Sequence, residues 1–369
     1  MIDPIINFFT MVFQWIGRGI GLVIGWLLWP FLWLGRWWLR KGWIIKTIVG
    51  ALVIGIVVFY AYFIVQTQVW SNFNTDYVQA YDFGQRKTLP GEPVEGQANT
   101  CGKSSIVEVA ADLTDFNVNQ NAWIPSMLAS KMGLFGMDWK YTPFFDNKAA
   151  FQLGINEILR RTSFELVDRL GRVRGTSQID QNLQDARQNL NYPENRWYLT
   201  TTAPYFISPT PTTYRAAVKN LRGFNDRLMA CGATFDPRAD NLLRFIDTMT
   251  NAIGSTSDIL RDQIEVSNAG WFDTRADDRF WFAYGQLYAL NGILAGARSD
   301  FSKIIDERGV TKTWQEAESQ LRSALNMQPW IISNGAEAAF IMPSHLATMG
   351  FYLLRVRANM TEMRDILDR

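Results

Sequence analysis

Histidine and cysteine are scarce in this chain of 369 residues, which contains one histidine, His345, and two cysteines, Cys101 and Cys231. A single histidine argues against zinc sites rich in histidine and against most catalytic triads, which use histidine as a base. An excess of charge of one sign is also missing, because 36 basic side chains balance 35 acidic ones. That balance gives no electrostatic support for nucleic-acid binding. We expect no metal, no cofactor and no nucleic-acid partner.

Familiar catalytic motifs are missing as well: the sequence holds no Walker A loop, nucleophile elbow, HExxH or CxxC. What remains is carboxylate chemistry in residues 271–281 (WFDTRADDRFW), where acids lie among aromatic side chains. A glycan-cleaving site needs two carboxyl groups with different pKa values, and Asp273 and Asp278 are the candidates. Both also lie where a helix is expected to begin. Capping of backbone N–H groups is therefore the alternative, and we favour it.

The long apolar runs lie in the first 65 residues. Residues 47–65 (TIVGALVIGIVVFYAYFIV) carry no charge, and at about 1.5 Å per residue they cover one bilayer thickness. They predict a transmembrane helix. The segment before it holds Arg36, Arg40, Lys41 and Lys46. Basic residues beside a span favour the cytoplasm, so we expect residues beyond about 70 to be extracytoplasmic.

An earlier apolar stretch, residues 3–34, predicts a second helix that either spans the membrane or lies in its interface. Its small residues recur every four positions on one face, as in the small-xxx-small pattern of packed membrane helices. This stripe would contact the second span or another chain; the alternative is an in-plane amphipathic helix. The candidate packing residues, including two glycines of the second run, are Gly17, Arg18, Gly21, Gly25, Gly50 and Gly55.

The rest of the chain is predicted to be mainly α-helical. We divide it into a membrane anchor (1–70), a linker rich in glycine and proline (71–105), and an all-helical, bundle-like periplasmic domain (106–369). Only residues 105–109 and 197–202 carry weak strand signals. Cys101 and Cys231 either form a disulfide in an oxidising compartment or remain separate buried thiols.

Two further patterns suggest contact surfaces. Residues 127–137 (MLASKMGLFGM) are rich in methionine and glycine, and either dock on lipid or a partner protein or form a short core helix with a turn. The last helix alternates apolar residues in a 4-3 pattern, which packs lengthwise within a bundle or against a second copy. The residues of this pattern are Leu346, Met349, Leu353, Val356, Met360 and Met363.

The layout resembles a bacterial family of inner-membrane proteins catalogued only as a domain of unknown function. The likeness rests on the N-terminal span, Trp123-Ile-Pro-Ser126, Phe144-Phe-Asp-Asn147 and Phe151-Gln-Leu-Gly-Ile155, followed by an arginine-rich helix. The resemblance implies a location in a Gram-negative inner membrane. It transfers no catalytic residue.

These patterns favour a non-enzymatic, membrane-anchored periplasmic scaffold or accessory subunit of a cell-envelope complex. Its expected partners are the lipid bilayer and either copies of itself or other membrane proteins. One alternative is an envelope glycan hydrolase that uses paired carboxylates. Another is a protein that handles lipids or other hydrophobic ligands around Trp281 and Trp330.

Overall fold

The computed structural model describes residues 3–86, 88–97, 99–142, 144–173, 178–266, 273–335 and 342–369. These residues form helices and isolated bridges but no strand, which confirms the mainly α prediction. The chain divides into two compact units, Met1–Tyr62 and Phe63–Arg369.

The α-helices are α1 (Asp3–Arg40), α2 (Trp43–Gln68), α3 (Ser105–Asp115), α4 (Leu128–Met132), α5 (Asn147–Glu165), α6 (Gln181–Leu190), α7 (Thr210–Met229), α8 (Ala239–Val266), α9 (Ala276–Asp300), α10 (Ser302–Glu307), α11 (Thr311–Leu325) and α12 (His345–Leu367). Short 3-10 or π segments are η1 (Tyr77–Tyr81), η2 (Phe83–Gln85), η3 (Phe116–Gln120), η4 (Ile124–Ser126), η5 (Trp139–Tyr141) and η6 (Leu166–Leu170).

The first unit consists of α1 and most of α2. Helix α1 continues through Pro30, and α2 is 26 residues long. Among the described residues, α2 is the one helix whose length and apolar character suffice to cross a membrane. It can therefore anchor the chain in a bilayer, as the uncharged run predicts.

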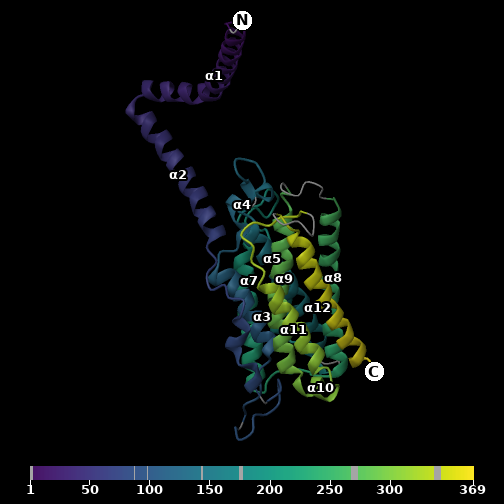
Figure 1. Cartoon of the computed structure of the whole chain (residues 1–369). Helices are drawn as coiled ribbons and strands as arrows, with labels where there is room; N and C mark the ends of the chain where they lie inside the picture. The colour runs from purple at the N-terminus through teal and green to yellow at the C-terminus, as the bar shows by residue number, and fades with distance from the viewer. Residues whose placement is uncertain are drawn as a thin grey trace. The chain divides into compact units, whose positions relative to one another are not determined.

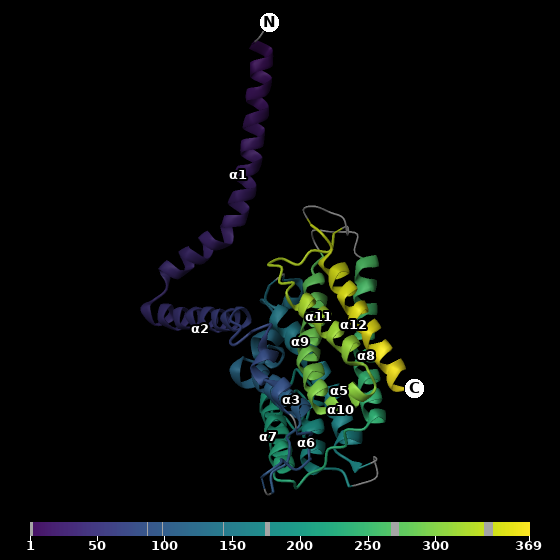
Figure 2. The ribbon, with the colours of Figure 1, turned by 60° about the horizontal axis from the view of Figure 1, so that its bottom comes forward.

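Helix α9 is the centre of the second unit. Figures 1 and 2 show it between α3 and α7 on one side and α8 and α12 on the other, and it packs directly against α3, α5, α8, α11 and α12. Every residue from Ala283 to Ala297 is buried. A helix surrounded on all sides needs apolar or small residues all round, which is what this segment of α9 supplies.

Glycines set the distance between α5 and α9, which form the most extensive helix pair of the unit. A Cβ atom at Gly154 of α5 would overlap the carbonyl oxygen of Phe282, and one at Gly285 of α9 would overlap that of Phe151. The two backbones therefore touch at a crossing that only glycine permits at both positions.

Residues 71–105, expected as a linker, contain a segment that packs on the bundle. Phe73 and Tyr77 lie against the core. The Tyr77 ring stacks on Tyr288 with 4.6 Å between centroids, and its hydroxyl donates to the Tyr288 carbonyl at 2.8 Å. The weak strand signal at 105–109 is wrong, because Ser105 begins α3 and Ser104 caps it. A disulfide joins Cys101 to Cys231, just beyond the end of α7.

Candidate functional site

Asp273, one of the two acids predicted from the sequence, is held by structural hydrogen bonds. Its carboxylate accepts from Gln263 Nε2 at 2.9 and 3.0 Å and from Asn334 Nδ2 at 2.8 Å. It also accepts from the backbone N–H of Arg275 at 3.1 Å, immediately before α9. These bonds join the end of α8, the start of α9 and the segment before α12, so Asp273 has a positioning role here.

Asp278 lies in a separate cluster of acids at the first turns of α5 and α9. Burial is the largest cause that raises the pKa of Asp278. Burial also raises the pKa of Asp146, and the charges of Asp278 and Asp277 raise it further. Both carboxyl oxygens of Asp146 are buried and no described residue donates a hydrogen bond to them, so the nearby charge of Asp278 favours the protonated form of Asp146. Burial and the charge of Asp278 raise the pKa of Asp277 to about 7.

This cluster combines a structural and a chemical property. Asp277 and Asp278 occupy the first turn of α9, where the helix dipole favours negative charge. With its amide oriented to satisfy both neighbours, Asn147 donates to Asp277 Oδ2 at 3.1 Å and accepts from Trp281 Nε1 at 3.3 Å. Chemically, a carboxyl group that keeps its proton near neutral pH is suited to act as a general acid. Among the described residues, no group of three or more histidine, cysteine or acidic side chains is arranged to hold a metal.

Sequence reasoning missed Asp146 and its neighbour Lys148. Asp146 precedes α5 directly, in the position of an N-cap, and this was the signal available in FFDN. Lys148 is almost completely buried, and its Nζ donates to the carbonyls of Gln66 at 3.0 Å and Val69 at 2.6 Å. Burial lowers the pKa of Lys148 to about 8. Lys148 thus caps the C-terminal end of α2.

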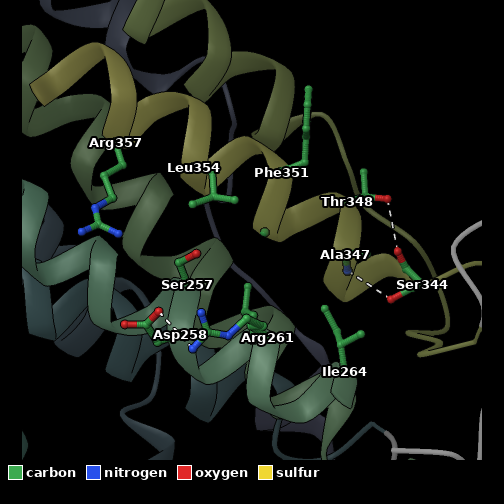
Figure 3. Close-up of a pocket in the computed structure, with 12 residues that line it drawn as sticks. Ser257, Asp258, Arg261, Ile264, Ser344, Ala347, Thr348, Phe351, Leu354 and Arg357 are labelled. Atoms are coloured by element: carbon green, nitrogen blue, oxygen red, sulfur yellow. Dashed lines mark hydrogen bonds and ion pairs between the residues drawn. The ribbon is translucent and has the colours of Figure 1, made fainter. Parts of the chain in front are cut away.

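A second site is the open groove between α8 and α12, with a volume of about 620 Å³ (Figure 3). Small residues of α12, among them Ala347 and Gly350, line it beside α8. Phe351 and Leu354 line it with about half of each side chain exposed. Charged side chains border it, and they are Asp258 and Arg261 on α8 and Arg357 on α12.

The apolar stripe of α12 lies on the opposite side of the helix from solvent. All six residues named above as a candidate association surface, from Leu346 to Met363, are completely buried within the chain. The bundle alternative is therefore correct, and these side chains offer no surface to a second copy. The exposed residues of α12 are others, Phe351 and Leu354 among them.

The glycine stripe of α1 contacts nothing within the described structure. A Cβ atom at Gly17, Gly21 or Gly25 would have no neighbour within 4 Å, and the same holds for Gly55. At Gly50 it would lie 3.6 Å from the Trp38 ring. The helix–helix seam predicted for this stripe stays a prediction.

The remaining sequence candidates have structural surroundings. His345 Nδ1 accepts from the backbone N–H of Ser333 at 3.0 Å, and burial lowers the pKa of His345. Trp281 packs against Trp70 with 5.1 Å between ring centroids, so it belongs to the aromatic core. Trp330, by contrast, is 87 % exposed.

Comparison with known proteins identifies a family. A family model described as "Uncharacterized protein conserved in bacteria (DUF2333)" matches residues 123–270 and 261–369, well over half of the chain. The chain belongs to this bacterial family, which confirms the resemblance drawn from the Trp-Ile-Pro-Ser and Phe-Phe-Asp-Asn motifs. No curated protein and no solved structure matches it.

Proposed function

We propose that this member of the DUF2333 family is an accessory subunit of a bacterial cell-envelope complex, anchored in the inner membrane with its helical domain in the periplasm. Basic residues before α2, such as Arg40 and Lys46, favour the cytoplasmic side for that end of the helix. The disulfide between Cys101 and Cys231 supports an oxidising compartment for the domain. The subunit acts by binding another protein and not by catalysis.

The α8–α12 groove is the observation that carries this proposal. Phe351 and Leu354 expose apolar surface along it, and Arg357 makes no ion pair with any described residue. An apolar groove bordered by an arginine that has no ion pair within the described structure fits an amphipathic helix that brings apolar side chains and one acidic side chain. The occupant proposed is such a helix of a partner protein.

The test is the mass of the full-length protein in native nanodiscs, before and after changes in the groove. We expect the wild-type protein to form a stoichiometric complex. Phe351→Glu and Arg357→Glu should each lower the bound fraction by about tenfold or more, because the first places a negative charge against the helix and the second reverses the charge of the border. Phe206→Glu is the matched control, since Phe206 is an exposed phenylalanine that does not line the groove. A lone monomer, a complex of identical copies only, or a complex indifferent to both groove variants contradicts the proposal.

A second candidate function is hydrolysis of an envelope glycan. The observation that favours it is the buried acidic cluster of Asp146, Asp277 and Asp278, whose raised pKa values are typical of catalytic acids. Asp278→Asn should then abolish glycan cleavage while the melting temperature and the complex in nanodiscs stay unchanged. If purified wild-type protein releases no fragments from peptidoglycan, the hydrolase candidate is wrong.

A further inference from the structure

An exposed apolar patch lies in two loops of the second unit. The first loop runs from α4 through η5, and the second precedes α12. Phe135 is 79 % exposed and Trp330 87 %, and the other members expose about half of their surface. The exposed apolar patch consists of Met132, Phe135, Met137, Tyr141, Trp330 and Ile331. Phe144 connects the loops, since its ring lies 6.5 Å from that of Trp330.

The first loop and Phe144, which follows it, are attached to the last turns of α2. The Trp139 ring packs on Phe63 with 4.8 Å between centroids, and both residues are buried. Gln68 donates to the carbonyl of Phe144 at 2.8 Å. Phe63 lies inside the uncharged run that ends at Val65. The loop that carries Trp139 therefore lies level with the end of the apolar run, at the depth where a helix leaves the hydrocarbon.

The backbone places Phe135 at the tip of its loop. Leu134 and Met137 exchange backbone hydrogen bonds of 2.8 and 3.1 Å, which closes a tight turn. Phe135 and Gly136 have φ values of +51° and +93°, the left-handed conformation of a type I′ turn. This conformation is strained for phenylalanine, whereas asparagine and glycine adopt it readily. The turn nevertheless presents an aromatic ring outward.

We propose that the exposed apolar patch rests in the interfacial layer of the lipid bilayer that α2 crosses. Tryptophan and tyrosine prefer the headgroup level, and methionine adapts to an irregular surface. Lys131 is exposed beside the patch and suits anionic headgroups, whereas Lys140 is paired with Asp138 at 2.9 Å and lies over the Tyr141 ring at 5.1 Å. Moving these apolar side chains from water into the interface lowers their free energy.

This contact goes beyond the proposed function. It requires α2 to span the membrane, but it depends neither on which side the domain lies nor on what occupies the groove. It gives the domain a second attachment to the bilayer besides α2 itself. Two attachments restrict rotation of the domain about the helix axis, so the groove would keep a defined orientation to the membrane surface.

The test uses single cysteines in the full-length protein. The two native cysteines are bonded to each other, so an introduced thiol can be labelled selectively with the environment-sensitive fluorophore NBD. Phe135→Cys reports on the patch. Lys312→Cys is the control, because the Lys312 side chain is 88 % exposed. Lys312 lies in the first turn of α11, which follows α10 at the end of the bundle away from α4 (Figure 1). Both proteins are reconstituted in vesicles of phosphatidylethanolamine and phosphatidylglycerol.

The label at position 135 should emit at shorter wavelength than the label at 312. It should be quenched at least about twofold by lipids with a spin label near the headgroup, and little by aqueous iodide; the label at 312 should show the reverse. Equal iodide quenching at both positions overturns the proposal. So does a label at 135 that neither quencher reaches, because protein would then cover the patch. If Phe135→Cys does not fold, Trp330→Cys on the second loop gives the same readout with the same outcomes.

Discussion

The hydroxyl of Ser104 donates a 2.6 Å hydrogen bond to the carboxylate of Asp300, across 196 positions of sequence. The same carboxylate accepts from the backbone N–H groups of Ser105 and Ile106 at 2.7 and 3.0 Å. Asp300, the last residue of α9, is fully buried and thus accepts hydrogen bonds from the backbone N–H groups of the first turn of α3. Burial raises the pKa of Asp300 to about 6, although these hydrogen bonds act to lower it.

Asp300→Ala should strongly destabilise the domain. The substitution leaves three donors without an acceptor, and each unsatisfied buried group costs about 1–3 kcal/mol, so we expect a loss of about 3 kcal/mol or more. The measurement is chemical unfolding of the full-length protein in detergent. The control Asp365→Ala removes an exposed carboxylate and should change the free energy of unfolding by about 0.5 kcal/mol or less. Equal stability of the two variants contradicts the role given to Asp300.

Glycine at the crossing of α5 and α9 should resist even the smallest substitution. Gly154→Ala and Gly285→Ala each force the backbones apart, and overpacking of this kind costs about 1–3 kcal/mol. Gly350→Ala in α12 is the control, because nothing lies within 4 Å of its Cβ position. There the better helix propensity of alanine should stabilise by about 0.5–1 kcal/mol. Thermal melts of the three variants should separate in opposite directions, and destabilisation by all three alike would contradict the close approach.

Asp277 should make stability depend on pH between about 4 and 7. Its pKa is 3.8 when unfolded and about 7 in the folded protein, so the folded state binds the proton more tightly. The stability contributed by this proton is present below pH 4 and is lost as pH rises through 7.

Asp277→Asn removes that titration. We expect the free energy of unfolding of the variant to fall less than that of the wild type from pH 4 to pH 7, with a difference on the order of 1–4 kcal/mol. Asp365→Asn, at an exposed position, controls for the general effect of removing one carboxylate. A variant with the wild-type pH profile would show that Asp277 keeps an ordinary pKa.

The disulfide should matter both for stability and as a marker of compartment. Replacing Cys101 and Cys231 together by serine removes a bond that closes a loop of 130 positions. We expect a loss of about 2–5 kcal/mol in the free energy of unfolding. Wild-type protein from cells lysed with a thiol-blocking reagent should run faster on a non-reducing gel than on a reducing one. Free thiols in such a sample would contradict the periplasmic placement.

Pairing of the acids shows where sequence reasoning reached its limit. The sequence favours Asp273 and Asp278 as a pair because both acids lie among aromatic side chains in one segment. In the structure Asp273 accepts hydrogen bonds from Gln263 and Asn334. Asp278 instead interacts with Asp146, at the start of another helix. That partnership depends on how α5 lies against α9, which no local pattern encodes.

The sequence by itself determined the apolar helix α2, the helical class of the domain and the family. Each depends on local patterns: an uncharged run, a period of 3.6 residues, and short motifs such as Trp123–Ser126. It also marked the stripe of α12, since one helix face must be apolar wherever it is buried. Only the tertiary structure decided that this stripe faces α8, α9 and α11 and not a second copy. Only it placed Trp139 and Phe144 beside the end of α2, because such contacts join residues far apart in the chain.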